Sequence, residues 1–276
     1  MIDLHLHTTA SDGLLSPSEL VHKARAAGLS TISITDHDTT AGCDAAHDAA
    51  RAAGLELVPG IEISAVADGR DVHVLGYFFD TASMALRAFL DRQREDRLRR
   101  VSEMGSRLAT LGCPIDVAPI LESAARGRSV GRPQIAEALM ASGYVATRDE
   151  AFDRFLEFRG PAYVPRRGAS PQEVVAILHE AGGIASLAHP GIARRDGSIG
   201  PLAAAGLDAL EVRHSDHDDA TETRYRDLAR RYNLLVTGGS DFHGESASRV
   251  SRFGALSITI AELDDLRRAA ARRARS

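Results

Sequence analysis

Seven short apolar segments, most of them followed by a helical pattern, restrict the fold of this chain more than any other feature of its sequence. Their length and their β-branched residues predict strands near residues 2–6, 31–35, 57–63, 72–78, 184–187, 209–212 and 234–237. Strands that alternate with helices predict an α/β fold with a parallel sheet, either closed or doubly wound. Residues 64–71 are too few for a crossover helix, so we expect the third and fourth strands to be antiparallel and any barrel to be distorted.

Two helix starts and one long insertion divide the chain further. Ser16-Pro17-Ser18-Glu19 and Ser170-Pro171-Gln172-Glu173 each combine a capping serine, a proline at the first helical position and a glutamate three residues on. Between residues 81 and 167 helical patterns predominate, with helices expected at 84–111, 133–141 and 149–157. We therefore expect a barrel domain of residues 1–80 and 168–276, with residues 81–167 as an inserted helical subdomain. Such an insertion is either a solvated scaffold or a cap over an active site.

Composition excludes several classes of protein. The chain has 276 residues, 44% of them hydrophobic, and a formal net charge of -5, which indicates a large core and provides no global basic field for nucleic acid. Two cysteines are too few for a disulfide framework and favour a reducing compartment. The sequence shows neither a signal-peptide pattern nor an apolar stretch of about 18 residues. We therefore expect a cytoplasmic protein that does not enter a membrane.

Histidines and carboxylates recur where the expected strands end. His5 and His7 lie two residues apart in the first strand, so their imidazoles project from the same face. The first loop, the later strands and the segments that follow them add Asp12, His37, Glu62, His73, His189, Asp241 and His243. Because ligand sites of barrel-like sheets collect at the carboxyl ends of strands, we expect these side chains to converge.

This donor set favours a polynuclear metal site. Six histidines and three carboxylates exceed the roughly four ligands of one tetrahedral zinc ion. They suit two or three divalent ions, with a carboxylate such as Glu62 as a bridge, and imidazole mixed with carboxylate fits Mn, Zn or Fe. Metal ions with open positions generate hydroxide at neutral pH and stabilise an anionic transition state. Phosphate ester hydrolysis is the reaction class that most needs both.

The same motifs, in this order, resemble those of the PHP (polymerase and histidinol phosphatase) phosphoesterases. They are His5-Leu6-His7, Thr35-Asp36-His37-Asp38, Gly60-Ile61-Glu62, His73-Val74-Leu75-Gly76, Ala188-His189-Pro190 and Ser240-Asp241-Phe242-His243. The resemblance implies a distorted (β/α)7 barrel with a trinuclear site, most simply loaded with Mn. By motif, the first metal is expected on His5, His7, Glu62 and Asp241, the second on Glu62, His73 and His189, and the third on Asp12, His37 and His243.

The insertion resembles that of one branch, the 3',5'-nucleoside bisphosphate phosphatases, whose relatives also trim short RNA. In that branch an Arg-Pro-His segment reaches the substrate, and the corresponding stretch here begins Arg132-Pro133-Gln134. The resemblance therefore implies that Arg132 binds the 5'-phosphate. Gln134 replaces the expected histidine; it can donate a hydrogen bond but carries no charge. The alternative for Arg132 is a solvated arginine at a helix start.

Two other groups of residues allow more than one interpretation. His214 and His217 follow the sixth expected strand, and His217 is the better match to the branch as a phosphate ligand or general acid, with a surface pair of no role as the alternative. The arginines of the long helix alternate with acidic residues, which is typical of a solvated helix face rather than of a nucleic-acid track. These arginines are Arg92, Arg94, Arg97, Arg99 and Arg100.

We therefore expect a metal-dependent phosphatase of small nucleotides, in which Asp241 and His217 are catalytic, and which has no obligate protein partner. One alternative is a 5'-3' exoribonuclease or phosphodiesterase that acts on short oligonucleotides or cyclic phosphates at the same metals. An amidohydrolase is disfavoured because its usual bridge is a carbamylated lysine, and the only lysine, Lys23, lies in the first helix. A non-catalytic, metal-stabilised interaction module is the alternative from another class.

Overall fold

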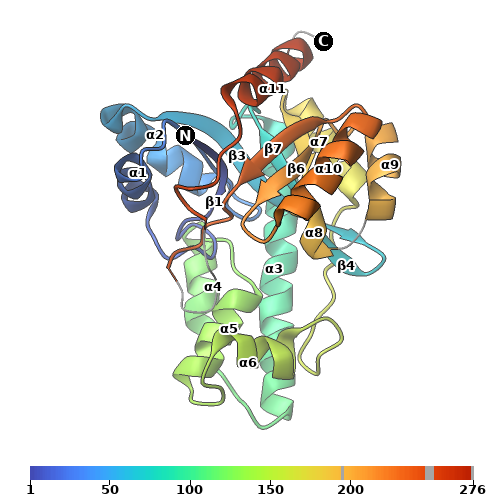
Figure 1. Cartoon of the computed structure of the whole chain (residues 1–276). Coiled ribbons are helices and arrows are strands. Elements are labelled where there is room, and N and C mark those ends of the chain that lie inside the picture. The colour runs from blue at the N-terminus through green and yellow to red at the C-terminus, as the bar shows by residue number, and fades with distance from the viewer. Residues whose placement is uncertain (194–195, 246–251, 275–276) are drawn as a thin grey trace.

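A seven-stranded sheet forms the centre of the protein (Figure 1). The computed structural model describes residues 1–193, 196–245 and 252–274. The strands are β1 (Ile2–Leu6), β2 (Thr31–Ile34), β3 (Glu56–Ala67), β4 (Arg70–Tyr77), β5 (Ile184–Leu187), β6 (Ala209–His214) and β7 (Leu235–Gly239). They lie in the order in which they follow one another in the chain, and all neighbours are parallel except the pairs β3–β4 and β4–β5. The seven expected strands and the antiparallel pairing of the third with the fourth are confirmed.

The sheet curls until its two edges meet just beyond the end of β7. There the amide of Asp241 donates to the carbonyl of His5 at 2.9 Å, and the amide of His7 donates to the carbonyl of Phe242 at 3.0 Å. These bonds join β1 to the segment after β7, which satisfies polar backbone groups that an open edge would expose. The fold is therefore a nearly closed, distorted barrel, as expected.

The β3–β4 hairpin is longer than expected. Residues 64–67 pair with residues 70–73, and the turn between them is Asp68-Gly69, whose φ angles of 52° and 72° are the positive values that a tight two-residue turn needs. The expectation that the third strand ends near Glu62 is therefore wrong. Glu62 lies within β3, and the hairpin continues past it toward the inserted helices.

Helices cover the outside of the barrel. They are α1 (Pro17–Ala26), α2 (Ala41–Ala53), α7 (Pro171–Glu180), α8 (Pro190–Ala193), α9 (Asp196–Ala204), α10 (Asp219–Arg231) and α11 (Ile260–Arg273). Both expected capping boxes are present, with Ser16 and Glu19 at α1 and with Ser170 and Glu173 at α7. Among the residues that the structure describes, no helix combines the length and the apolar character that a membrane crossing requires.

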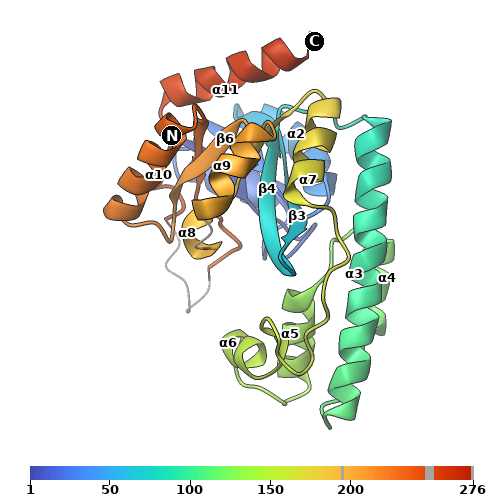
Figure 2. The same cartoon turned by 90° about the vertical axis from the view of Figure 1, so that its right-hand side faces the viewer.

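The insertion consists of α3 (Met84–Thr110), α4 (Ala118–Ala125), α5 (Arg132–Ala141), α6 (Arg148–Ala151) and a π-helical turn (Phe152–Leu156). The last two replace the single helix expected at residues 149–157. Figure 2 shows that α3 starts beside α7 and continues far beyond the hairpin, where α4, α5 and α6 lie. The first part of α3 packs Leu86 and Phe89 into the barrel core, whereas Val101 and Met104 belong to a second core formed within residues 101–164.

Candidate metal centre and arginine wall

The nine expected metal ligands converge at one end of the barrel. They come from β1 and the loop after it, from the segments after β2, β5 and β7, and from within β3 and β4. In three groups, one ligand atom from each residue lies within 4.8 Å of every other: His7, Asp12, His37 and His243; His5, His7 and Asp241; and His37, Glu62 and His73. His37 thus lies near Glu62 and His73, and also near Asp12 and His243, with which the motifs group it at the third metal.

Glu62 is buried at the middle of these groups. Ring nitrogens of five histidines lie within 3.4 Å of its carboxylate oxygens, with His5, His7 and His37 facing Oε2 and with His73 and His189 facing Oε1. Each oxygen therefore faces a different set of imidazoles. This is the arrangement that a carboxylate bridging two metal ions requires.

Burial and mutual attraction shift the pKa values of these groups strongly. Burial raises the pKa of Glu62, but the imidazoles of His37, His73 and His5 outweigh it and hold this pKa well below its usual range. Burial lowers the pKa of His7, but the adjacent carboxylates of Asp241 and Glu62 outweigh it and raise this pKa to about 10. For His37 burial dominates and lowers the pKa to about 3. The cluster therefore combines ionised carboxylates with imidazoles that are either neutral or held protonated by them.

The donor atoms fit divalent metal ions. Several ring nitrogens that face the cluster are buried and make no hydrogen bond: Nε2 of His5, both nitrogens of His7, and Nδ1 of His37 and of His73. Buried polar atoms without a partner are costly, so their concentration at one place indicates a bound group. Imidazole and carboxylate donors together are suited to Mn, Zn or Fe.

Two of the candidate ligands have unusual backbone angles. His189 has φ of 27° and Asp241 has φ of 52°, both in the left-handed region that residues other than glycine rarely adopt. Each follows a strand of the barrel, where the chain must turn sharply to present its side chain. Strain of this kind is tolerated where the surrounding structure enforces it, and it is common at functional sites.

His214 and His217 both lie in the interior. Strand β6 extends two residues beyond its expected end, so His214 is its last residue, and its Nε2 atom lies 3.2 Å from Oδ2 of Asp241. His217 donates from Nδ1 to the carbonyl of Val212 at 2.8 Å and accepts the amide of Gly191 on Nε2 at 3.2 Å. Both ring nitrogens of His217 are therefore engaged within the protein.

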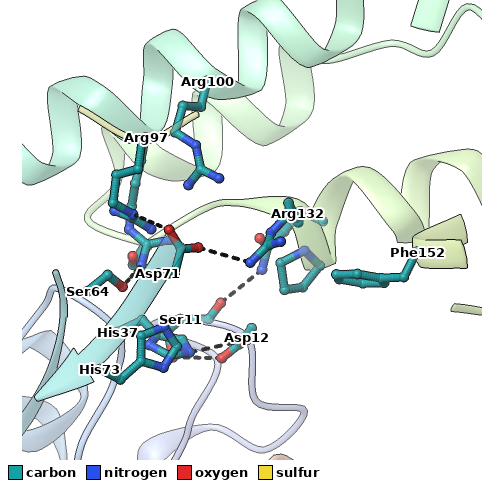
Figure 3. A pocket seen from close by; sticks show the side chains of 14 residues that line it. Ser11, Asp12, His37, Ser64, Asp71, His73, Arg97, Arg100, Arg132 and Phe152 are labelled. Atoms are coloured by element: carbon teal, nitrogen blue, oxygen red, sulfur yellow. Dashed lines mark hydrogen bonds and ion pairs between the residues drawn. The ribbon is translucent and has the colours of Figure 1, made fainter. Parts of the chain in front are cut away.

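A cavity of about 180 Å³ separates the metal ligands from a second set of charged residues (Figure 3). The first side carries His37, His73 and Asp12. The opposite side, which we call the arginine wall, consists of Arg97, Arg100, Arg132 and Arg166. The volume is several times the roughly 30 Å³ of one water molecule, so a substrate group has room between the two sides.

The arginines of α3 do not form the solvated face that their alternation with acids predicted. Arg92 and Arg94 are exposed, but Arg97 retains 7% and Arg100 only 2% of its accessible surface. Tertiary packing causes the burial of Arg97 and Arg100, because α3 passes beside the β3–β4 hairpin, where Gln93 donates to the carbonyl of Ser64 at 2.7 Å. One face of the helix is therefore solvated and the other lines the cavity.

Arg97 and Arg100 have different bonding. Arg97 donates to Asp38 at 2.7 Å, to the carbonyl of Val130 at 2.9 Å and to Ser64 at 3.1 Å, so each of its three guanidinium nitrogens is bonded within the protein. Arg100 donates from Nε to a carbonyl at 3.0 Å, but its buried Nη2 has no hydrogen-bond partner. Nε of Arg166 is likewise buried and makes no hydrogen bond, although it lies 3.6 Å from Asp71. Arg100 and Arg166 thus have donors left for a ligand.

Arg132 and Gln134, the two expected substrate contacts, lie at the start of α5. Arg132 donates to Oδ2 of Asp71 at 3.0 Å. Gln134 is buried; it accepts the amide of Gly131 at 2.7 Å and donates to the carbonyl of Ser11 at 3.2 Å. Gln134 therefore fixes the start of α5 against the loop that carries Asp12.

The arginine wall carries more positive than negative charge. Arg97, Arg132 and Arg166 form their ion pairs with the same two carboxylates, those of Asp38 and Asp71. Arg100 adds a fourth guanidinium, and burial and the neighbouring Arg166 lower its pKa to about 10. A buried excess of cationic donors fits an anionic ligand, and guanidinium groups suit phosphate through their paired donors.

Comparisons with known proteins agree with this chemistry. Residues 3–146 match the PHP domain. The chain is 38% identical over 250 residues to the 5'-3' exoribonuclease Rnm of Salmonella typhimurium, which covers 87% of this chain and 84% of that protein. It is 34% identical over 253 residues to the 3',5'-nucleoside bisphosphate phosphatase of Chromobacterium violaceum, and the alignment covers 88% of this chain and 87% of that protein. It is also 34% identical over 251 residues to a phosphoribosyl 1,2-cyclic phosphate 1,2-diphosphodiesterase of Eggerthella lenta, and this alignment covers 88% of this chain and 94% of that protein.

Two solved structures share the fold of this chain. A Bifidobacterium adolescentis protein described as a metal-dependent phosphoesterase has a TM-score of 0.86 and 37% identity, covering 96% of this chain and 94% of its own. An amidohydrolase from Chromobacterium violaceum, solved with sulfate and without metal, has a TM-score of 0.84 and 31% identity, and the match covers 99% of this chain and 96% of that one. The chain belongs to the PHP family and is a metal-dependent hydrolase of phosphate esters.

Proposed function

We propose that this enzyme removes the 3'-phosphate from nucleoside 3',5'-bisphosphates, with two or three divalent metal ions, most simply Mn. The observation that carries the proposal is the pairing of two walls across one cavity, metal ligands on one side and arginines with unused donors on the other. A substrate with two phosphate groups matches this pairing, because each group then faces cations that the other does not use.

The metal wall, by which we mean the nine candidate metal ligands, would bind the phosphate that is cleaved. When bound there, divalent ions supply a hydroxide nucleophile and neutralise charge on the phosphoryl oxygens. The protein's part is to hold the ligand atoms in place: Glu62 at the centre, with Asp12 and Asp241 on the side of His243, whose ring nitrogens lie 3.3 Å from Asp12 and 3.5 Å from Asp241. The carboxylates are buried and ionised, so they present full charge to the cations.

The arginine wall would bind the second phosphate. Arg100 and Arg166 offer buried donors that make no hydrogen bond, and Arg132 adds a third guanidinium that lines the same cavity. Because Arg100 and Arg166 are buried, their attraction for a dianion is weakly screened, whereas Arg132 is half-buried. Arg97 has no part in this contact, since its donors are already bound to Asp38, Val130 and Ser64.

An apolar pocket supports a nucleoside between the two phosphates. It has a volume of about 230 Å³ and shares Asp71, His73 and Arg132 with the first cavity. Its other lining residues include Val72, Leu187, Ala188, Pro190 and Ile192. A ribose with its base presents such an apolar surface, whereas a small sugar phosphate does not.

The helical insertion would act as a cap that completes the site. Residues 81–167 supply every arginine of the arginine wall, and three of their bonds reach the loop before Asp12. The amide of Ser129 donates to the carbonyl of Ala10 at 2.7 Å, and Arg128 and Gln134 donate to the carbonyl of Ser11 at 2.9 and 3.2 Å. We therefore assign residues 81–167 to the cap and the rest to the catalytic barrel.

A 5'-3' exoribonuclease is the second candidate, favoured by the 38% identity to such an enzyme. The same two walls would then bind the 5'-phosphate of an RNA end and the first internal phosphodiester. The two reactions differ in the fate of the phosphate that is attacked. A bisphosphate releases it as free phosphate, whereas in RNA it stays on the shortened chain as the new 5'-phosphate and the first nucleotide is released.

One product assay distinguishes these candidates. The Mn-loaded enzyme is incubated at equal concentration with adenosine 3',5'-bisphosphate, with a 5'-phosphorylated RNA tetramer and with a cyclic ribose phosphate, and the products are separated by chromatography. Our proposal predicts the highest kcat/KM for conversion of the bisphosphate to 5'-AMP and phosphate. Faster release of mononucleotides from the tetramer would establish the second candidate, and a preference for the cyclic phosphate would overturn both.

A further inference from the structure

Strand β6 places two buried polar side chains, Glu211 and His214, directly behind the metal ligands. Both are 0% exposed, and neither belongs to the nine expected ligands. We propose that Glu211 and His214 are positioning residues, which determine the ring nitrogen of His5 and the carboxylate oxygen of Asp241 that face the metal ions. This inference depends on the metal centre and not on the substrate proposed above.

Glu211 fixes the tautomer of His5. Its Oε1 accepts the Nδ1 proton of His5 at 2.8 Å, and its Oε2 accepts the backbone amide of His189 at 2.7 Å. Because Nδ1 is engaged with Glu211, Nε2 is the ring nitrogen of His5 that is left for a metal ion, and it faces Glu62 and Asp241, each at 3.4 Å. One carboxylate therefore orients one ligand by its side chain and a second, the strained His189, by its backbone.

His214 separates the roles of the two oxygens of Asp241. The amide of Asp216 donates to Nδ1 of His214 at 3.1 Å, so the ring proton resides on Nε2, which donates to Oδ2 of Asp241 at 3.2 Å. Oδ1 of Asp241 faces the other way, 3.1 Å from Nε2 of His7 and 3.4 Å from Nε2 of His5. The hydrogen bond from His214 thus turns Oδ1 toward the metal ligands.

An irregularity in β6 makes this arrangement possible. Residues 211 and 214 of a regular strand would project from opposite faces. The pairing of β6 with β7 shifts register between Glu211 and Arg213, so the strand gains a bulge at this point. The bulge brings both Glu211 and His214 to the interior, while Arg213 between them donates to the carbonyl of Ser257.

A purely structural role would require only that these side chains fill space, and matched variants separate the two possibilities. His214→Phe keeps the shape of a ring but removes both nitrogens, whereas His214→Gln keeps a donor at the position of Nε2. Glu211→Gln keeps shape and volume, but its amide cannot accept from both His5 and His189. Arg213→Gln, on the same strand but outside this network, is the control.

The test measures Mn²⁺ binding directly, with stoichiometry from metal analysis and affinity from calorimetric titration of the metal-free protein. Such groups behind metal ligands typically change metal affinity by about 10- to 100-fold. We expect that loss for His214→Phe and for Glu211→Gln, with His214→Gln and Arg213→Gln close to wild type. Wild-type stoichiometry and affinity in Glu211→Gln would overturn the inference. Wild-type binding by His214→Phe together with poor binding by His214→Gln would also overturn it. Because metal binding is measured, failure of the proposed substrate leaves this test intact.

Discussion

The two walls of the cavity are built in different ways. The ligands of the metal wall come from strands of the barrel and from the short segments after them, whereas the arginine wall is provided by α3, by the start of α5 and by the segment that contains Arg166. The strand ends lie at one edge because of the topology of the sheet itself. The arginines reach the cavity only because α3 packs beside the β3–β4 hairpin. One wall is therefore a property of the fold, and the other a property of how the insertion docks on it.

The largest effect is expected on the metal wall. Asp241→Ala removes a ligand that faces both His5 and His7, and it should lower kcat for phosphate release by at least about 10³-fold. Steady-state phosphate release with excess Mn measures this loss, and circular dichroism with thermal unfolding serves as the control for folding. Near-normal turnover in a metal-loaded variant would contradict the assignment of the metal wall.

Arg97 should matter for stability rather than for substrate binding. Arg97→Met leaves the buried Asp38 with Arg166, at 3.4 Å, as its remaining arginine partner, and should lower the free energy of unfolding by about 3 kcal/mol. Urea denaturation of the metal-free protein measures this change. The double variant Arg97→Met with Asp38→Asn should recover part of the loss, because the uncompensated charge is then absent; no recovery would mean that the ion pair contributes little.

Arg100→Met should affect substrate binding instead. Loss of a charged hydrogen bond of about 1.5–3 kcal/mol predicts a fall of about 10- to 100-fold in kcat/KM for a nucleoside 3',5'-bisphosphate, with little change for the 3'-monophosphate. The matched control is Arg94→Met, from the exposed face of the same helix, which should change neither value. Equal losses on both substrates would show that Arg100 acts on the metal wall or on folding.

The pH dependence of metal binding should come from the metal wall alone. The pKa of His7 is raised to about 10, so the metal-free protein holds this proton at pH 7, and metal binding must release it. Mn²⁺ affinity should therefore rise with pH between 6 and 8, by about tenfold per pH unit for each proton released. Calorimetry in buffers of different ionisation enthalpy counts these protons. Binding without proton release would contradict the electrostatic description of the cluster.

The sequence reveals the metal wall because its signals are local. A strand has a short, recognisable pattern, and a histidine or carboxylate beside its end can be located without knowing any partner. The extension of β3 and the bulge in β6 were not predicted, since both depend on pairing with another strand. The positions of Glu62 within β3 and of His214 within β6 therefore became visible only in the structure.

The sequence does not reveal the part of the arginine wall that α3 provides, for a related reason. Arg97 and Arg100 alternate with acidic residues, and this pattern alone predicts a solvated face. Their burial depends on how α3 packs against the hairpin and, for Arg97, on Asp38, which is distant in the chain. The spacing along the helix offers one usable signal, because Gln93, Arg97 and Arg100 follow one another at intervals of four and three residues. Residues so spaced share one helical face, and Arg92 and Arg94 lie to either side of it.

The most direct test of the two-wall account is the ratio of kcat/KM for adenosine 3',5'-bisphosphate to that for adenosine 3'-monophosphate, measured with Mn in the wild-type enzyme and in Arg100→Met. We expect a ratio of at least about 10 in the wild type, because the second phosphate gains charged hydrogen bonds, and a ratio at least about 10-fold lower in the variant, which loses one of them. A wild-type ratio near 1, or a high ratio that Arg100→Met leaves unchanged, would contradict the two-wall account.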